Sequence, residues 1–315
     1  YWLVYSLYSR QARAGSVLSP YPAVTVSPDT QTTSQRLAQQ IAASGPISVA
    51  DYMRVANTDY YGRADPLGAD GDFITAPEIS QMFGEMVGIW LSDIWLRRGS
   101  PSPCHYVELG PGRGTLAADA LRTMKRFGFE PVVHFVENSP ALRERQVAAV
   151  PQAVFHDDVE TVPTDAPLFV VANEFFDALP IAQSIATNAG WRERVVVPDH
   201  SARFAAMPGP RATDGQVPGH FRMASVGSIY ETCPDANAVM HKLSTRLSGQ
   251  GGVMLTIDYG YLQPALGSTL QAVQNHKYAD PFSEPGHCDL TAHVNFHELT
   301  LSAQRSGLNV AGPCN

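Results

Sequence analysis

Short apolar runs alternate with helical patterns between residues 104 and 174, as a parallel β-sheet with crossover helices requires. The runs are rich in β-branched residues, which is typical of strands that are buried on both faces. They predict strands over residues 104–109, 131–137, 152–156 and 168–173. A helix over 236–247 and a further strand over 252–258 continue the series. The pattern predicts an α/β fold.

The region before this series is predicted to be helical. Residues 34–43 and 49–55 favour two short helices, the second ending before Tyr60. Thr75 and Glu78 match a capping box, with Thr75 as N-cap. The helix behind them carries an apolar stripe at positions 79, 82, 83, 86, 87, 90, 91, 94 and 95. The stripe predicts that this helix packs against the core.

Residues 181–230 interrupt the α/β alternation. Two β-rich runs around residues 187–190 predict a hairpin, and a stretch rich in proline and glycine follows at 198–219. We interpret 181–230 as an insertion at the carboxyl edge of the sheet, where substrate-recognition elements commonly lie. Residues 1–34 are rich in Ser, Thr and Pro, so we expect them to be poorly ordered.

Charge and cysteine content narrow the classes of partner. The net charge is −8, which disfavours nucleic acid, and no run approaches the roughly 18 apolar residues of a membrane span. Four cysteines without a CxxC pair suit a reducing compartment. Cys288, His293 and His297 would suit a metal only if a third ligand stood at the required spacing. We therefore predict no metal.

The loop after the first strand of the series is the most specific motif. Gly110, Gly112 and Gly114 follow Glu108 in a GxGxG pattern, whereas dinucleotide-binding loops space their glycines as GxGxxG. Bare glycines let a ligand approach the backbone closely. A neighbouring acid suits a positively charged ligand, and S-adenosylmethionine (SAM) fits that description. A strand-to-helix turn without a ligand is the alternative.

Acidic residues end the next two strands. Glu137 follows the second strand, where nucleoside-binding α/β folds place an acid on the ribose hydroxyls. Asp157 and Asp158 follow the third strand and are candidates for the adenine amino group, or are simply solvated. These acids extend the cofactor hypothesis.

The fourth strand ends on a polar and aromatic loop that we assign to the substrate. Asn173 and Phe176 resemble the asparagine and aromatic residue with which amino-group methyltransferases hold a target nitrogen. Glu174 and Asp177 suit a cationic nitrogen such as a guanidinium, because carboxylates pair with it in bidentate fashion. The alternative is a polar loop that caps the next helix. Asp258, at the end of the fifth strand, lines the same crevice or belongs to a turn.

These motifs together resemble a known family. The matching segments are 71–80, 83–85, 108–115, 173–180, 257–260 and 285–294. They are similar to the MidA-type family, which includes the mitochondrial protein arginine methyltransferase that serves respiratory complex I assembly and relatives in proteobacteria. The resemblance covers roughly residues 37–313.

The resemblance implies a Rossmann-like class I SAM-dependent methyltransferase fold, with SAM as cofactor and a protein arginine as substrate. The substrate protein of the mitochondrial members is a complex I subunit. The residues implied are Gly110, Gly112, Gly114 and Glu137 for SAM, Glu174 and Asp177 for the arginine, and Thr75, Pro77 and Glu78 at the pocket border.

The resemblance also divides the chain. We expect an N-terminal segment at 1–34, a helical cap at 35–100 and a methyltransferase core at 101–315 with its insertion at 181–230. Family members continue past the Gly-Pro at 312–313, so the last strand of the sheet is expected to be missing. The compartment is cytoplasmic for a bacterial member, or the mitochondrial matrix, and a homodimer is the expected assembly.

Two other functions stay open at this point. One is a methyltransferase that acts on a small molecule. The other is a non-catalytic assembly factor that keeps the fold and binds a partner through residues 181–230.

Overall fold

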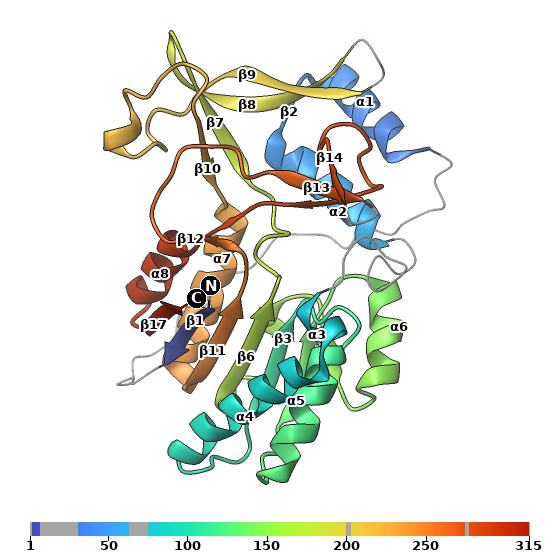
Figure 1. The fold of residues 1–315 in the computed structure, drawn as a ribbon, viewed down its shortest axis with the longest axis vertical. Coiled ribbons are helices and arrows are strands. Elements are labelled where there is room, and N and C mark those ends of the chain that lie inside the picture. Colours follow the sequence, from blue (N-terminus) through green and yellow to red (C-terminus); the bar gives the residue numbers. More distant parts are fainter. Residues whose placement is uncertain (1, 7–30, 63–74, 200–202, 275–276, 315) are drawn as a thin grey trace.

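The computed structural model describes residues 2–6, 31–62, 75–199, 203–274 and 277–314. Its main sheet has seven strands in the order β17-β1-β11-β6-β3-β4-β5 (Figure 1). Their bounds are β1 Trp2–Ser6, β3 His105–Leu109, β4 Val132–Val136, β5 Val154–His156, β6 Leu168–Asn173, β11 Gly252–Ile257 and β17 Asn309–Cys314. Strands β11, β6, β3, β4 and β5 are parallel. The five strands predicted from the apolar runs are therefore confirmed.

The strand order creates a crevice at one edge of the sheet. From β3 the chain moves outward to β4 and β5, and then returns to the other side of β3 as β6 and β11. The loops that follow β3 and β6 consequently leave the sheet in opposite directions. Open α/β sheets bind ligands at such a switch point, outside the carboxyl ends of the strands.

Helices cover both faces of this sheet, as predicted. On one face α4 (Gln81–Arg97) and α5 (Thr115–Arg126) bury a core with β3, β4 and β6. On the other face α7 (Pro234–Gln250) and α8 (Phe296–Arg305) pack on alternate residues of β3, β6 and β11. Because both faces are buried, the strands have nearly continuous apolar sequences.

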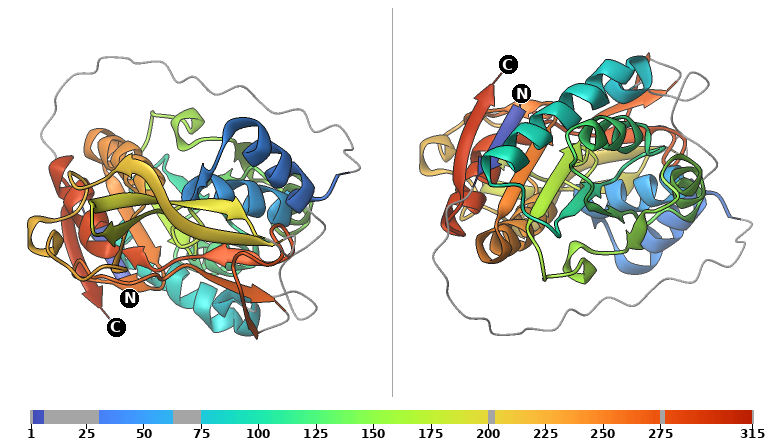
Figure 2. Two further views of the ribbon diagram at one scale, coloured as in Figure 1. Left: turned by 90° about the horizontal axis from the view of Figure 1, so that it is seen from above. Right: turned by 90° about the horizontal axis from the view of Figure 1, so that it is seen from below.

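A second body lies over the carboxyl ends of the strands and is called the cap here (Figure 1). Its helices are α1 (Thr33–Ser44) and α2 (Val49–Gly62), and they share a core with its strands. The strands form two small sheets: β10-β7-β8-β2, with β9 on β8, and β14-β13-β15. Their bounds are β2 Ile47–Ser48, β7 Ala182–Thr187, β8 Gly190–Pro198, β9 Phe204–Ala212, β10 Ile229–Thr232, β13 Gln271–Gln274, β14 Lys277–Ala279 and β15 Asp289–Thr291. Seen from above, the helices and β8–β9 lie side by side over the core (Figure 2).

The packing of the elements divides the described residues differently from the domain boundaries expected from the sequence. Helix α4 lies before residue 100 but packs on α5 and the main sheet, so it belongs to the core. Conversely, β13–β15 lie beyond the expected insertion at 181–230 and belong to the cap. Strands β12 (Gly260–Tyr261) and β16 (Val294–Asn295) pair at the entry and exit of that second cap segment.

The expected disorder of residues 1–34 is wrong for the part that the structure describes. Residues 2–6 form β1, which pairs antiparallel with β11 on one side and β17 on the other. The short apolar run at 2–5 suits a strand between two partners. Residues 31 and 32 lead into α1 and residues 33 and 34 belong to it, while 7–30 lie outside the described residues. Strand β17, with β1 beside it, forms the end of the described sheet.

Two local expectations about helices also need correction. Helix α2 runs on to Gly62 instead of ending before Tyr60. The capping box is absent: Thr75 makes no side-chain cap bond, and the helix it opens, α3 (Ala76–Ile79), ends at an extended Ser80 before α4 begins. Glu78 is engaged elsewhere, since its carboxylate accepts a 2.7 Å hydrogen bond from the Thr115 hydroxyl. In the described part of the chain, no helix has the length and apolarity needed to cross a bilayer.

The contact between α4 and α5 depends on glycine. A Cβ on Gly88 would lie 2.5 Å from the carbonyl oxygen of Ala120, a separation that real structures do not show. We expect Gly88→Ala to push α4 away from α5 and to cost about 1–3 kcal/mol of unfolding free energy. Denaturant unfolding measures this loss. Gly249→Ala in α7 is the control, because a Cβ there meets open space, and it should be neutral or slightly stabilising. Equal midpoints for the two variants would contradict the packing argument.

Candidate functional site

A cleft of about 2530 Å³ lies between the carboxyl ends of the main sheet and the cap. Most residues singled out from the sequence line it: Thr75, Pro77, Glu78, Glu108, Gly110, Gly112, Glu137, Asp157, Asp158, Asn173, Glu174 and Asp177. Three do not, namely Gly114, Phe176 and Asp258. The structure thus gathers into one space residues that lie over a hundred positions apart in the chain.

The glycine loop forms a bare backbone bend. Gly110, Gly112 and Gly114 have φ values of 55°, 55° and 82°, a left-handed region that side chains with a Cβ rarely adopt. A Cβ on Gly110 would lie 3.1 Å from the Phe175 ring, and one on Gly114 would lie 3.2 Å from Ala149. Gly114 therefore serves packing against α6 (Pro140–Ala149), while Gly110 and Gly112 border the cleft.

Glu108 differs from the charged group expected beside this bend. It is buried and accepts a 2.5 Å hydrogen bond from the Tyr106 hydroxyl. Burial raises the pKa of Glu108 to about 8, so the side chain is mostly uncharged at neutral pH. Its contribution to the cleft is a polar, largely neutral group instead of a fixed negative charge.

Glu137 lies at the end of β4, beside the glycine bend. Its carboxylate accepts a 2.8 Å hydrogen bond from the Ser139 backbone N–H and a 3.1 Å bond from the Gln146 side chain. The same Gln146 amide donates to the Gly112 carbonyl at 2.7 Å. Burial raises the pKa of Glu137, although these donors oppose the shift. Gln146 thus connects Glu137 with the glycine bend, the two features that the sequence assigned to the same cofactor.

The two aspartates after β5 already have protein partners. Asp157 is mostly exposed and forms an ion pair with Arg143. Asp158 accepts a 2.9 Å hydrogen bond from the Glu160 backbone N–H and pairs with Lys242 at 2.9 Å. Asp158 is therefore the N-cap of the short 3-10 helix η1 (Val159–Thr161), and an adenine contact remains a prediction for both residues.

Glu174 and Asn173 form the floor of the cleft at the end of β6. Glu174 is held at φ 47°, an uncommon conformation for a residue with a side chain, and its N–H donates to the Ile257 carbonyl at 2.8 Å. Its carboxylate accepts from the Ala76 backbone and the Asn173 amide, while burial raises its pKa. The Asn173 Oδ1 atom is buried and has no partner among the described residues. A ligand with a hydrogen-bond donor would satisfy it.

The loop continues with a group of buried carboxylates. The pKa of Asp177 lies well above its usual range, first because it is buried and then because Asp258, Asp289 and Glu174 carry like charges nearby. Burial likewise raises the pKa of Asp258 to about 7. Buried carboxylates are costly unless a cation or hydrogen bonds compensate them. The arrangement favours a positively charged ligand.

Phe176 and Asp258 do not occupy the predicted substrate pocket. Phe176 is buried in the core against α7 and α8, and its neighbour Phe175 lines the cleft instead. Asp258 is buried behind the loop and accepts N–H bonds from Phe176 at 2.9 Å and Tyr259 at 2.9 Å. Asp258 therefore holds the loop after β6 in place through hydrogen bonds to its backbone.

The cap supplies a carboxylate that the sequence did not identify as functional. Asp289 on β15 lines the cleft, and the Tyr61 hydroxyl lies 2.9 Å from both of its oxygens. The Ala292 N–H, three residues later, donates to the Asp177 carbonyl at 2.9 Å. Asp289 belongs to one of the segments on which the family resemblance rests. Its place in that segment is the sequence feature from which Asp289 could have been identified as a site residue.

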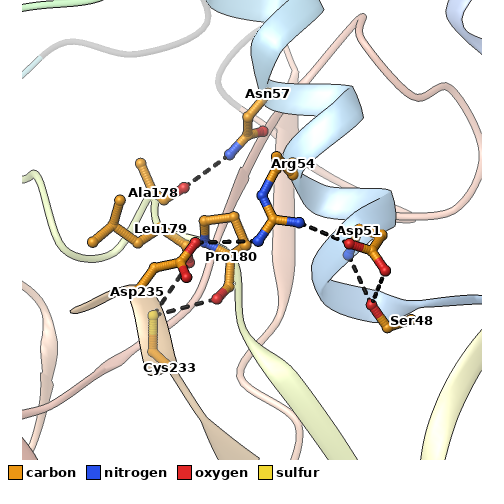
Figure 3. A network of polar contacts seen from close by, with 9 residues as sticks. All are labelled: Ser48, Asp51, Arg54, Asn57, Ala178, Leu179, Pro180, Cys233 and Asp235. Atoms are coloured by element: carbon orange, nitrogen blue, oxygen red, sulfur yellow. Dashed lines mark hydrogen bonds and ion pairs between the residues drawn. The ribbon is translucent and has the colours of Figure 1, made fainter. Parts of the chain in front are cut away.

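A polar network ties the cap to the substrate loop (Figure 3). Asn57 of α2 donates to the Ala178 carbonyl at 3.1 Å and to the Leu290 carbonyl at 2.8 Å. Arg54, one turn earlier, pairs with Asp51 at 2.7 Å and with Asp235 of α7 at 3.2 Å. The cap helix is thereby held against both the core and the acidic loop.

The histidines considered for a metal lie on different elements. His293 stands between β15 and β16, whereas His297 is in α8, so they do not share a helical face. The described residues hold no cluster of three or more His, Cys, Asp or Glu side chains suited to a metal ion.

Comparison with known proteins shows which family the chain resembles. Residues 86–314 match the family described as "Putative S-adenosyl-L-methionine-dependent methyltransferase". The chain is 36% identical over 327 residues to the mitochondrial protein arginine methyltransferase NDUFAF7 homolog of Drosophila melanogaster, covering 89% of this chain and 72% of that protein. It is 35% identical to human protein arginine methyltransferase NDUFAF7, mitochondrial, covering 86% and 68%.

Solved structures agree with the sequence comparisons. A Burkholderia thailandensis protein bound to S-adenosyl-homocysteine superimposes with a TM-score of 0.72 at 25% identity, covering 87% of this chain and 76% of that one. A native structure of a protein from the same organism gives 0.70 at 27% identity, covering 87% and 75%. The neighbours have the Rossmann-like fold predicted from the sequence.

The glycine bend can be tested with S-adenosyl-homocysteine. Gly110→Ala places a methyl group against Phe175 in a left-handed bend, and we expect it to weaken binding at least tenfold by calorimetric titration. Gly128→Ala is the matched control, because it has φ 76° and no atom near its Cβ position. It should lose a similar amount of folding stability but keep its affinity. Equal affinities would remove the bend from the ligand site.

The raised pKa of Glu108 predicts a pH-dependent stability. Between pH 4.5 and 8 the unfolded chain ionises Glu108 while the folded protein keeps it protonated, so this residue stabilises the fold less as pH rises. Glu108→Gln cannot ionise and retains an acceptor for Tyr106. Its thermal midpoint should therefore rise relative to the parent protein between pH 5 and pH 8. A constant difference across that range would show that Glu108 has an ordinary pKa.

Proposed function

Because the chain belongs to the family of S-adenosyl-L-methionine-dependent methyltransferases, we propose that its substrate is an arginine side chain of a protein. The observation that carries this proposal is the set of carboxylates around Asp177 at the cleft. Relatives named protein arginine methyltransferases support it. A guanidinium is the protein side chain that remains cationic at all physiological pH values and pairs with two carboxylates at once.

The residues at the nucleoside end fit the cofactor. Gly110 and Gly112 offer a backbone without Cβ atoms, and Glu137 presents a carboxylate beside them. The buried Oδ1 of Asn173 is an unused acceptor between this end and the substrate loop. We propose that the glycine bend and Glu137 hold SAM, which supplies an electrophilic methyl group on its sulfonium.

We propose that Glu174 and Asp177 bind the guanidinium and orient one nitrogen toward the methyl donor, with Thr75, Pro77 and Glu78 at the cleft border. Pairing keeps positive charge on the nitrogens that do not react. The nitrogen that gains a methyl group must release a proton, and a buried carboxylate with a raised pKa is suited to accept it. Asp289, oriented by Tyr61, adds a carboxylate from the cap side.

The physiological setting follows from the relatives. Their names place them in mitochondria, and we propose the mitochondrial matrix for this protein in preference to a bacterial cytoplasm. We further propose a respiratory complex I subunit as the substrate and a homodimer as the assembly. The net charge of −8 disfavours a nucleic-acid substrate.

Labelled SAM and a mitochondrial extract test the function. Incubation with the protein should place label in polypeptides, and acid hydrolysis should yield labelled methylarginine. Label confined to small molecules would replace the proposal with a small-molecule methyltransferase. Cofactor binding without any transfer would leave a non-catalytic assembly factor.

A substitution tests the role of Glu174. Glu174→Gln keeps the size and one acceptor oxygen but removes the charge, so turnover should fall at least tenfold while S-adenosyl-homocysteine affinity stays within about twofold. The control is Glu130→Gln, an exposed residue near Lys125, which should match the parent in both measurements. Unchanged turnover would exclude Glu174 from the reaction.

A further inference from the structure

Three buried histidines form a hydrogen-bonded chain across the main sheet. His105, His134 and His156 lie on the neighbouring strands β3, β4 and β5, each less than 10% exposed. His105 Nδ1 lies 2.9 Å from His134 Nε2, and His134 Nδ1 lies 2.9 Å from His156 Nε2. The spacing is that of N–H···N hydrogen bonds, so the rings bind one another in series.

Both ends of this chain terminate on hydrogen-bond acceptors. At the start of β3, His105 Nε2 lies 2.8 Å from the carboxylate of Asp165, which is 72% exposed. At the end of β5, His156 Nδ1 lies 2.8 Å from the Thr161 hydroxyl, and that hydroxyl donates to the Asp158 carbonyl at 2.8 Å. Asp158 lines the cleft. The chain therefore crosses the sheet from solvent to the nucleoside side of the site.

The number of protons does not match the number of links. Each hydrogen bond needs one proton, and the chain from Asp165 to the Asp158 carbonyl has five links. Neutral imidazoles contribute one N–H each and Thr161 contributes one O–H, which supplies four protons. All five links are satisfied only when the chain holds one more proton.

We propose that His105, His134 and His156 carry one excess proton as a single unit and thereby hold the loop 157–161 in position for the cofactor. If that proton were absent, the Thr161 hydroxyl would have to donate to His156, and the Asp158 carbonyl would keep only its 3.1 Å bond from the Thr161 backbone N–H, or another link would break. These residues are positioning residues, because they act on the cleft through Thr161 and Asp158.

The surroundings of the chain disfavour a positive charge on two of its histidines, His134 and His156. Burial lowers the pKa of His134 to about 4. Positive charge on the neighbouring His105, His156 and Arg246 would lower it in the same direction. The pKa of His156 is lowered by burial and by the positive charges of Arg246 and Arg143. The negative charge of Asp157 opposes this shift. Asp165 stays ionised, because the His105 hydrogen bond lowers its pKa. The ionised carboxylate of Asp165, 2.8 Å from His105 Nε2, is the anionic end of the chain.

The loop that this chain holds is also secured from α7. Arg246 donates to the carbonyls of Val159 and Pro163, and Lys242 pairs with Asp158. The histidine chain adds the contact from the sheet side. The loop at the nucleoside side is thus fixed between the sheet and α7.

The substitution Asp165→Asn provides a decisive test of the proton count. An asparagine amide donates to His105, so all five links can form with every imidazole neutral. Long-range ¹H–¹⁵N spectra of histidine-labelled protein at pH 7 distinguish imidazolium from the two neutral tautomers. We expect one imidazolium among the three buried rings in the parent protein and none in Asp165→Asn. The control Asp93→Asn removes an exposed carboxylate from an ion pair on α4 and should leave the imidazolium in place.

The positioning role has its own measurement. Thr161→Val keeps the shape of the side chain and the 3.1 Å backbone bond from its N–H to the Asp158 carbonyl, but it removes the hydroxyl that links His156 to that carbonyl. S-adenosyl-homocysteine affinity should fall about fivefold, the value of one neutral hydrogen bond. Asp165→Asn, which preserves every link, should bind as tightly as the parent protein. Three neutral rings in the parent, or an imidazolium that survives Asp165→Asn, would overturn the proton count. Unchanged affinity in Thr161→Val would overturn the positioning role.

Discussion

Burying several carboxylates at the end of a parallel sheet is the constraint on which this structure depends. Ionised carboxylates resist removal from water, and those near Asp177 also repel one another. The protein tolerates the cost by directing backbone N–H groups at Asp258 and the Tyr61 hydroxyl at Asp289. In the proposed function, the guanidinium of a substrate arginine would compensate several of these acids at once.

The two bodies of the protein are coupled through this same place. The core contributes the loop after β6, and the cap contributes Asp289 and the helix that carries Asn57. Asn57 bonds to both the loop and β15, so the acids from the two bodies are fixed relative to one another. The cleft is therefore lined by residues of both bodies.

The sequence predicted what depends on local periodicity and missed what depends on tertiary neighbours. The buried strands and the glycine bend follow from apolar runs and residue type, and both are confirmed. Strand β9 was missed because prolines 208 and 210 lie in it, and prolines are tolerated there since β9 pairs only with β8 in the described sheet. Tyr61 and Asp289 stand 228 positions apart, so no spacing rule joins them. The neutral state of Glu108 arises from burial, which a motif does not reveal.

The left-handed backbone at Glu174 lowers the stability of the fold at a residue whose carboxylate is proposed to bind the substrate. A residue with a Cβ in that conformation carries strain of order 1–3 kcal/mol, which glycine would relieve. Selection for heat resistance alone would therefore favour glycine at this position, and under the proposed role of Glu174 the more heat-resistant protein would lose the carboxylate that binds the substrate.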